Sequence, residues 1–276
     1  MGGHAGIPAA LAAIAVMTAP SAFAFDSTAQ SSPGSPVFLT VEEAADFSKQ
    51  IEDSLAQNGA RVAMVFRSGR DRDRLPDNVQ YTHGAFWVYQ DIQRDDGSVM
   101  RGYAVYNLYH GDGEEMPRTT SYLLQDFPFD FTEASAVNDV AVIIPEPELQ
   151  RRILNVIASS AYEELHIPDY SLISNASDPE FQNCNEFMLD VIAAAAWQTT
   201  DYTQIKANLA AHFEPTEIDV NFFERLFAPM ADERLQTDDH RGAIETVTYS
   251  SLANFLREYS MLQATYILER DPSLRS

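Results

Sequence analysis

The folded part of the chain opens with apolar residues at helical spacing. In VEEAADFSKQIEDSLAQNG, residues 41–59, one helix face would carry these apolar side chains: Ala44, Phe47, Ile51 and Leu55. Thr40 and Glu43 match the pattern of a capping box, and Gly59 is a residue type that often ends a helix. The pattern therefore predicts an amphipathic helix that begins after Thr40 and stops at Gly59.

Runs of β-branched and aromatic residues predict several strands after this helix. RVAMVFR, residues 61–67, reads as a short apolar strand. QYTHGAFWVYQ, residues 80–90, and RGYAVYNLYH, residues 101–110, flank a turn at residues 95–97 and predict a β-hairpin. NDVAVIIP, residues 138–145, predicts a further strand.

Alternation along the hairpin sorts its side chains into two sets. One face of the first strand should carry this set: His83, Ala85, Trp87 and Tyr89. The other face should carry the remaining set: Thr82, Gly84, Phe86 and Val88. By the same rule Asn107 and His110, both on the second strand, should face opposite ways.

The second half of the chain has helical patterns. Pro147 opens a helix through LQRRILNVIAS. A turn-rich stretch ending near Asn183 then leads into CNEFMLDVIAAAAW, residues 184–197, a strongly apolar helical run. Additional helices are expected within residues 203–260 and should pack on the preceding core.

The first residues differ in character from the rest. Gly6 to Pro20 is almost wholly apolar, and small residues at Ala22 and Ala24 fit a signal-peptidase site, so residues 1–24 are expected to be a cleaved signal peptide. A membrane anchor is the alternative, although the stretch is short for a span of roughly 20 residues. Residues 25–39, rich in Ser, Pro and Gly, predict a flexible spacer.

Charge excludes one large class of functions. The chain has 18 Lys and Arg against 41 Asp and Glu, a formal net charge of -23 at pH 7, which phosphate backbones and anionic membrane surfaces repel. We therefore expect no nucleic-acid partner. With no second long apolar run, we expect no integral membrane span in the mature chain, which would be periplasmic or extracellular.

The chain has a single cysteine, Cys184, at the predicted start of the apolar helix. A lone thiol in an oxidising compartment is either buried and inert or retained for its reactivity. A helix N-terminus stabilises a thiolate and offers backbone donors to a developing oxyanion, as a reactive thiol would need. From the residues alone, however, a small core residue is the favoured interpretation, because free cysteine is among the most buried residue types.

Two charged segments have competing interpretations. RSGRDRDRLPDN, residues 67–78, mixes arginines with aspartates and is either a self-neutralising surface loop or a guanidinium clamp at the rim of a site. Asp238, Asp239 and His240 could bind a divalent cation, but a turn is the simpler interpretation. No phosphate loop or serine-hydrolase elbow is present, and we expect neither a metal nor a cofactor.

The segments THGAFWVY (82–89) and NCNEF (183–187) resemble the histidine strand and the nucleophile motif of circularly permuted papain-like proteins, of the NlpC and lecithin:retinol acyltransferase types. More closely, the chain resembles an uncharacterised family of secreted bacterial proteins, domain of unknown function 2145. The segments that carry this likeness are RSG (67–69), YTHGAF (81–86), PEP (145–147), YS (170–171), QNCNEFMLD (182–190) and TDDHRGAIETVTYSSLANFL (237–256).

This resemblance implies an α+β domain, an antiparallel sheet with packed helices, and a circularly permuted papain-like core. The core would span residues 40–200, with a helical extension at 201–276 packed on it. In this comparison Cys184 corresponds to the nucleophile and His83 to its base.

The remaining site residues follow less directly. The third catalytic group would be Asn107, preferred because an amide oxygen can hold the imidazole N–H, or else His110. Gln182 or the Cys184 backbone N–H could serve the oxyanion. Substrate contacts are assigned to four residues: Gln182, Asn183, Arg67 and Trp87.

The expected function is a secreted thiol hydrolase or acyl-transfer enzyme that acts on an amide or ester. Compartment and analogy favour a peptidoglycan peptide as the substrate, with lipid acyl groups next. The alternative from another class is a non-catalytic periplasmic binding or accessory protein that retains the fold.

Overall fold

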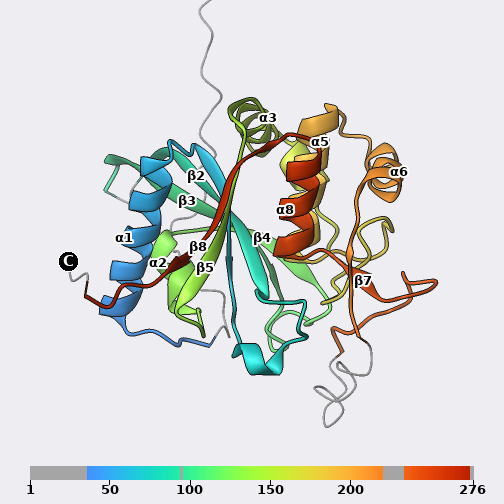
Figure 1. Cartoon of the computed structure of the whole chain (residues 1–276), viewed down its shortest axis with the longest axis horizontal. Helices are drawn as coiled ribbons and strands as arrows, with labels where there is room; N and C mark the ends of the chain where they lie inside the picture. Colours follow the sequence, from blue (N-terminus) through green and yellow to red (C-terminus); the bar gives the residue numbers. More distant parts are fainter. Residues whose placement is uncertain (1–35, 94–95, 220–232, 274–276) are drawn as a thin grey trace, which may run out of the picture.

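A computed structural model describes residues 36–93, 96–219 and 233–273 of the chain. It is an α+β structure built on a six-stranded sheet (Figure 1). The strands of this sheet are β1 (Val62–Arg67), β2 (His83–Gln93), β3 (Val99–His110), β4 (Ser121–Asp126), β5 (Asp139–Pro145) and β8 (Leu262–Glu269). A separate two-stranded ribbon consists of β6 (Thr216–Glu217) and β7 (Glu245–Thr246).

The helices of the described segments flank this sheet. They are α1 (Val41–Gln57), η1 (Arg72–Arg74, a 3₁₀ turn), α2 (Pro128–Glu133), α3 (Pro147–Ile157), α4 (Ala161–Glu164), α5 (Cys184–Trp197), α6 (Tyr202–His212) and α8 (Tyr249–Glu258). None of the helices within the described segments is both long enough and apolar enough to cross a membrane. The expected signal peptide, residues 1–24, and most of the expected spacer lie outside the described residues.

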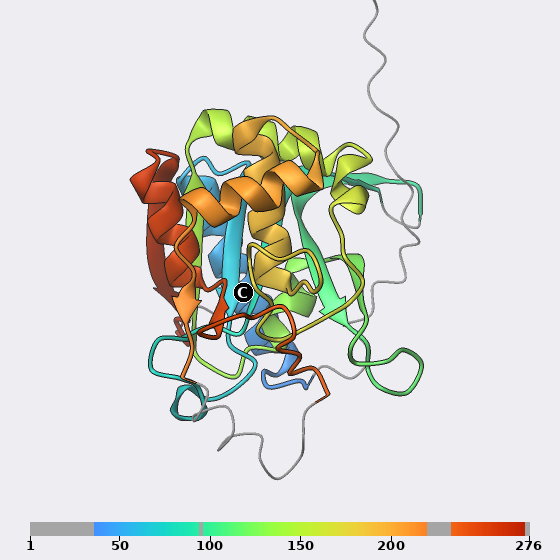
Figure 2. The same ribbon diagram turned by 90° about the vertical axis from the view of Figure 1, so that its right-hand side faces the viewer.

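Every strand of the main sheet pairs antiparallel with its neighbours, in the order β4-β3-β2-β1-β5-β8. The sheet has helices on both sides (Figures 1 and 2). On one side α1 and α2 cover a core that includes Phe47, Trp87 and Phe131. On the other side α5 lies against the sheet beneath α6 and beside α8, over a second core that includes Phe86, Phe187 and Leu252.

The local patterns in the sequence are confirmed. Helix α1 has the capping box of Thr40 and Glu43, and the two hairpin strands form as expected. The expected alternation along β2 also holds: Ala85 and Trp87 face the α1 core, whereas Phe86 and Val88 face the α5 core.

The C-terminal segment differs from the expected helical extension. After α8, residues 262–269 form β8, which pairs with β5 at one edge of the main sheet. β8 is an edge strand, and one row of its side chains is partly exposed, so burial alternates only weakly along it. The sequence of β8 accordingly lacks a clear apolar periodicity. The described residues between 201 and 273 therefore contribute to the sheet itself as well as to the helices around it.

Helix α5 approaches β2 closely at Gly84. A Cβ atom at this position would lie 2.4 Å from Met188 Cε, 2.7 Å from Phe66 Cδ1 and 2.8 Å from Asn185 Oδ1. These distances are below ordinary van der Waals contact, so only glycine lets the helix N-terminus rest against the strand. The glycine after His83 thus sets the position of Cys184 relative to the sheet.

Substitution of Gly84 by alanine should destabilise the fold by about 1–3 kcal/mol, because a methyl group would overpack the contact between α5 and β2. Urea unfolding measures this change. Gly102→Ala in β3 is the matched control, since its nearest neighbour is at 3.6 Å, an ordinary contact. Equal free energies of unfolding for the two variants would contradict the close approach.

A buried ionic cluster joins α6 to α5. Lys206 Nζ lies 2.6 Å from Glu186 Oε1 and 2.9 Å from Asp190 Oδ1, and these side chains are 5% exposed or less. Gln182 Nε2 and Tyr202 Oη also donate to Asp190. Burial raises the pKa of both carboxyl groups, and the ammonium group acts against that shift.

Removal of the ammonium group in Lys206→Met should cost about 3–5 kcal/mol of unfolding free energy, because two buried carboxyl groups would lose their counterion. The comparison is Lys49→Met in α1, where an exposed lysine pairs with Asp53 and the expected loss is below about 1 kcal/mol. Chemical denaturation of both variants makes the test, and a Lys206→Met protein as stable as Lys49→Met would refute it.

Candidate functional site

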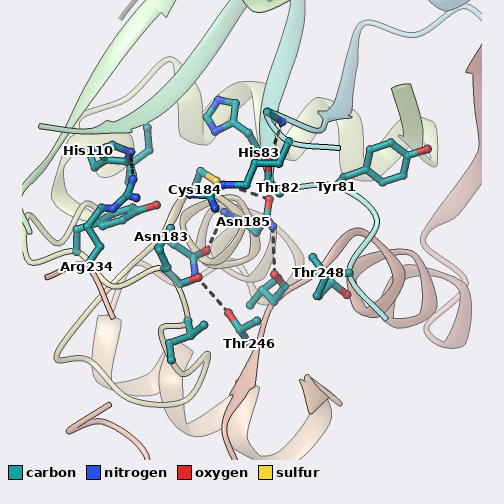
Figure 3. Close-up of a pocket in the computed structure, with 18 of the residues that line it drawn as sticks. Tyr81, Thr82, His83, His110, Asn183, Cys184, Asn185, Arg234, Thr246 and Thr248 are labelled. Atoms are coloured by element: carbon teal, nitrogen blue, oxygen red, sulfur yellow. Dashed lines mark hydrogen bonds between the residues drawn. The ribbon is translucent and has the colours of Figure 1, made fainter. Parts of the chain in front are cut away.

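Cys184 is the first residue of α5 and lines a cavity of about 420 Å³. Asn183 caps the helix: its side-chain oxygen accepts from the backbone N–H groups of Asn185 and Glu186, at 3.0 Å each. Figure 3 shows Cys184 and Asn183 together at this helix end, with Thr246 hydrogen-bonded to Asn183. The cap fixes the first turn and thereby the position of Cys184, a residue that is 6% exposed.

Backbone donors surround the thiol. The N–H groups of Gly84, Asn185 and Cys184 itself each favour the thiolate, as does the positive charge of Arg67. The cap uses the N–H groups of Asn185 and Glu186, and within the described segments the Cys184 N–H has no acceptor beyond its own side chain. This N–H is therefore available to an oxyanion formed at the thiol.

Burial outweighs these donors. Desolvation is the largest influence on Cys184 and raises the pKa of its thiol above the ordinary value. The resting site therefore holds a neutral thiol at neutral pH, and attack on a carbonyl would need a base to remove the proton during the reaction.

His83 begins β2 and belongs to a chain of hydrogen bonds. Its Nε2 lies 3.0 Å from Asn107 Oδ1, Asn107 Nδ2 donates to Asp126 Oδ2 at 2.9 Å, and the Tyr109 hydroxyl donates to the same oxygen at 2.7 Å. An ionised carboxylate only accepts, so it turns the Asn107 amide nitrogen toward itself and the amide oxygen toward His83. His83 then carries its proton on Nε2 and leaves Nδ1 as the basic nitrogen.

The surroundings keep this imidazole neutral. The ring stacks on Tyr109 with centroids 5.3 Å apart and lies 5.7 Å from the Phe131 ring. Burial, followed by the charge of Arg67, lowers the pKa of His83 to about 3. At neutral pH His83 is therefore a proton acceptor at Nδ1.

Cys184 and His83 meet at one cavity from different faces of the sheet. Cys184 lies with α5 beside Gly84, whereas His83 shares the face of Asn107 and Trp87; both line the cavity because it opens where β2 begins. Within the described segments no hydrogen bond joins the two side chains, and the thiol contacts Asn185 Oδ1 at 3.8 Å. Figure 3 shows their arrangement.

The substrate residues expected from sequence fall into two groups. Arg67 and Asn183 line the cavity, although Arg67 is buried and donates to the Ala134 carbonyl at 2.7 Å. Trp87 is fully buried in the α1 core and does not reach the cavity. Gln182 is also fully buried, and its amide is bonded to Leu165, Ile167 and Asp190, so the structure does not bring it to the cavity either.

The other histidines have separate surroundings. His110 lines the cavity on the opposite face of β3 from Asn107, and its Nε2 lies 2.8 Å from Arg234 Nη1. His240 Nε2 bonds the Ile173 carbonyl at 2.8 Å, in a turn closed by its backbone N–H. Across residues 36–93, 96–219 and 233–273, no group of three or more His, Cys, Asp or Glu side chains could hold a metal ion.

Sequence reasoning missed Asp126 and Tyr109, which hold Asn107 against His83. Asp126 ends β4, a strand whose mixed sequence SYLLQD gave no distinct periodic signal. Tyr109 follows Asn107 by two residues, so alternation alone places it on the same face. Its role could have been inferred from that spacing, whereas the pairing of β4 with β3 could not.

The family model for an uncharacterized protein conserved in bacteria (DUF2145) matches residues 54–256, which include Cys184, His83, Asn107 and Asp126. No curated protein and no solved structure matches the chain. The matched range covers most of the sequence and includes the cavity-lining residues of β2 and α5. On this basis the chain belongs to the DUF2145 family of uncharacterized bacterial proteins.

Proposed function

We propose that this protein is a thiol hydrolase or acyl-transfer enzyme with a circularly permuted papain-like core, acting on an amide or ester. The observation that carries the proposal is that one cavity is lined both by the thiol of the first residue of α5 and by an imidazole whose tautomer the Asn107 contact fixes. Chain order adds support, because the histidine strand precedes the cysteine helix and a glycine after the histidine lets that helix approach.

The proposed reaction begins with a neutral pair. The Cys184 sulfur attacks the carbonyl carbon while its proton passes to His83 Nδ1, and the Cys184 N–H donates to the resulting oxyanion. The bond to the amine or alcohol then breaks, and that leaving group takes the proton from His83. Water, or another acceptor, finally attacks the thioester and regenerates the thiol.

The resting structure requires one adjustment for this reaction. Cys184 and His83 make no hydrogen bond with each other in the described segments, so the imidazole and the thiol must approach each other when substrate enters. Catalytic hydrogen bonds are often longer without substrate and tighten in the reacting complex. The Asn107 contact preserves the tautomer during such a shift only if Asn107 Oδ1 stays bonded to Nε2.

A second candidate function is a non-catalytic binding or accessory protein. This function is favoured by the lack of a hydrogen bond between the thiol and the imidazole in the described segments, together with the raised pKa of the thiol. For either function we propose a periplasmic or extracellular location, supported by the apolar stretch from Gly6 to Pro20. A peptidoglycan peptide is the substrate that this location favours.

Acylation of Cys184 separates the two functions. Incubation with p-nitrophenyl acetate, an acid quench and intact-mass analysis should reveal an acetyl thioester that is absent in Cys184→Ala. His83→Gln should slow its formation by about 10²–10⁴-fold, because the general base is lost. His212→Gln, an exposed histidine on α6, is the control and should acylate at the native rate.

Equal acylation rates in native protein and His83→Gln would remove His83 from the mechanism. Failure of the native protein to form any thioester with this ester, while it remains folded, would favour the binding function instead.

The pH dependence of acylation should show an acid limb near pH 6 that belongs to Asp126. Burial raises the pKa of Asp126 to about 6, whereas His83 stays neutral down to about pH 3. Below pH 6 the protonated carboxyl group no longer holds the Asn107 amide in one orientation, and the rate should fall. In Asp126→Asn the limb should disappear from the rate profile; persistence of the same limb would assign it to another group.

A further inference from the structure

The cavity beside Cys184 carries the opposite charge from the rest of the chain. The chain has 18 basic against 41 acidic residues, yet the charged residues that line the cavity within the described segments are Arg67, Arg70, Arg118, Arg234 and Asp112. A concave wall of one sign of charge concentrates field lines and attracts ligands of the opposite sign. Its excess of arginine therefore points to an anion.

Asp112, the acidic residue of this wall, is already hydrogen-bonded within its own loop. The Asp112 carboxylate accepts from the backbone N–H groups of Glu114 at 2.8 Å, Glu115 at 2.9 Å and Met116 at 3.2 Å. Arg118 donates to the Asp112 backbone carbonyl at 3.1 Å and forms no ion pair with the described residues. Glu114 and Glu115 are exposed and lie outside the cavity wall.

Arg67 supplies an independent observation. It is 6% exposed. Among the described residues, its Nε has no hydrogen-bond partner and no carboxylate forms an ion pair with it. Asp126, whose charge reaches Arg67, instead accepts from Asn107 and Tyr109. A buried guanidinium group with an unpaired donor is costly unless an anion compensates it.

Figure 3 places Arg234 and His110 to one side of Cys184, joined by the hydrogen bond between them. Arg234 therefore lines the same cavity as the thiol at the N-terminus of α5, where the helix dipole also favours negative charge. Guanidinium groups bind carboxylate and phosphate oxygens through paired N–H donors.

We propose that this cavity binds an anionic substrate: an amide or ester that carries a carboxylate or phosphate group close to the bond attacked by Cys184. The arginine residues that line the cavity bind the carboxylate or phosphate group, and the carbonyl carbon of the substrate lies at the Cys184 sulfur. The reaction part of this statement rests on the function proposed above, whereas anion binding at the cavity does not.

Alkylation by two matched reagents tests the anion site. Iodoacetate and iodoacetamide share a leaving group and differ in charge, so the ratio of their rate constants at Cys184 measures local potential. In the native protein at low salt this ratio should exceed that of N-acetylcysteine by about tenfold, despite the net charge of the chain. It should fall as salt shortens the Debye length below roughly 10 Å.

Variants locate the effect. The double variant Arg118→Gln with Arg234→Gln should lower the ratio several-fold, since both side chains are at least partly exposed and line the cavity. Arg151→Gln on α3 removes an exposed arginine that does not line the cavity and should leave the ratio unchanged. A native ratio equal to that of N-acetylcysteine, or one that both substitutions leave unchanged, would overturn the proposal.

Direct binding covers the case in which the thiol reacts with neither reagent. Glutarate, propyl phosphate and neutral glutaramide are compared at equal ionic strength by the thermal midpoint of Cys184→Ser protein. Glutarate, propyl phosphate or both should raise the midpoint, and the larger rise identifies the preferred group; glutaramide should not. No rise with either anion, or an equal rise in the double arginine variant, would refute the anion site.

The two proposals fail separately. Stabilisation by an anion without acylation of native Cys184 would leave the anion site in place and remove the enzymatic function. Acylation without any preference for an anion would do the reverse.

Discussion

The close packing of α5 on β2 at Gly84 determines the geometry of the whole cavity. Because glycine leaves no side chain between helix and strand, the first turn of α5 reaches the strand where His83 begins. That contact places the Gly84 N–H close to the thiol and makes Cys184 part of the cavity lining. A larger residue at Gly84 would have to displace the side chains of Phe66, Asn185 and Met188, the last two in the first turns of α5.

Charge is distributed in two opposing ways around this contact. Between α6 and α5, Lys206 is buried with Glu186 and Asp190, so the ionic groups that anchor α6 to α5 neutralise one another. Arg67, which also lines the cavity, is buried and has no carboxylate partner among the described residues. The first arrangement fixes a helix, whereas the second leaves a positive potential in the cavity of an acidic protein.

The electrostatics of the thiol and imidazole favour a neutral resting pair. Burial raises the pKa of Cys184 and lowers that of His83, so proton transfer between them is unfavourable before substrate arrives. The chain from Asp126 through Asn107 still fixes which imidazole nitrogen is basic. In the proposed reaction, proton transfer would occur during attack, when the oxyanion and its donors offset the separated charge.

The sequence by itself determined the local elements, and its resemblance to papain-like proteins suggested the candidate pair. The α1 cap, the hairpin and the start of α5 at Cys184 follow from short-range periodicity and capping chemistry, which nearby residues control. Alternation also placed Asn107 and His110 on opposite faces of one strand, because side-chain direction in a strand has a period of two.

Only the tertiary structure decided the rest. The pairing of β4 with β3 brings Asp126 to Asn107, and β8 joins a sheet edge from the far end of the chain. The same packing buries Trp87 in the α1 core, although Trp87 is close in sequence to His83. It also leaves the Gln182 amide hydrogen-bonded to the loop before α5, although Gln182 is close in sequence to Cys184. Such pairings depend on contacts between segments many residues apart, whose register short-range patterns do not encode.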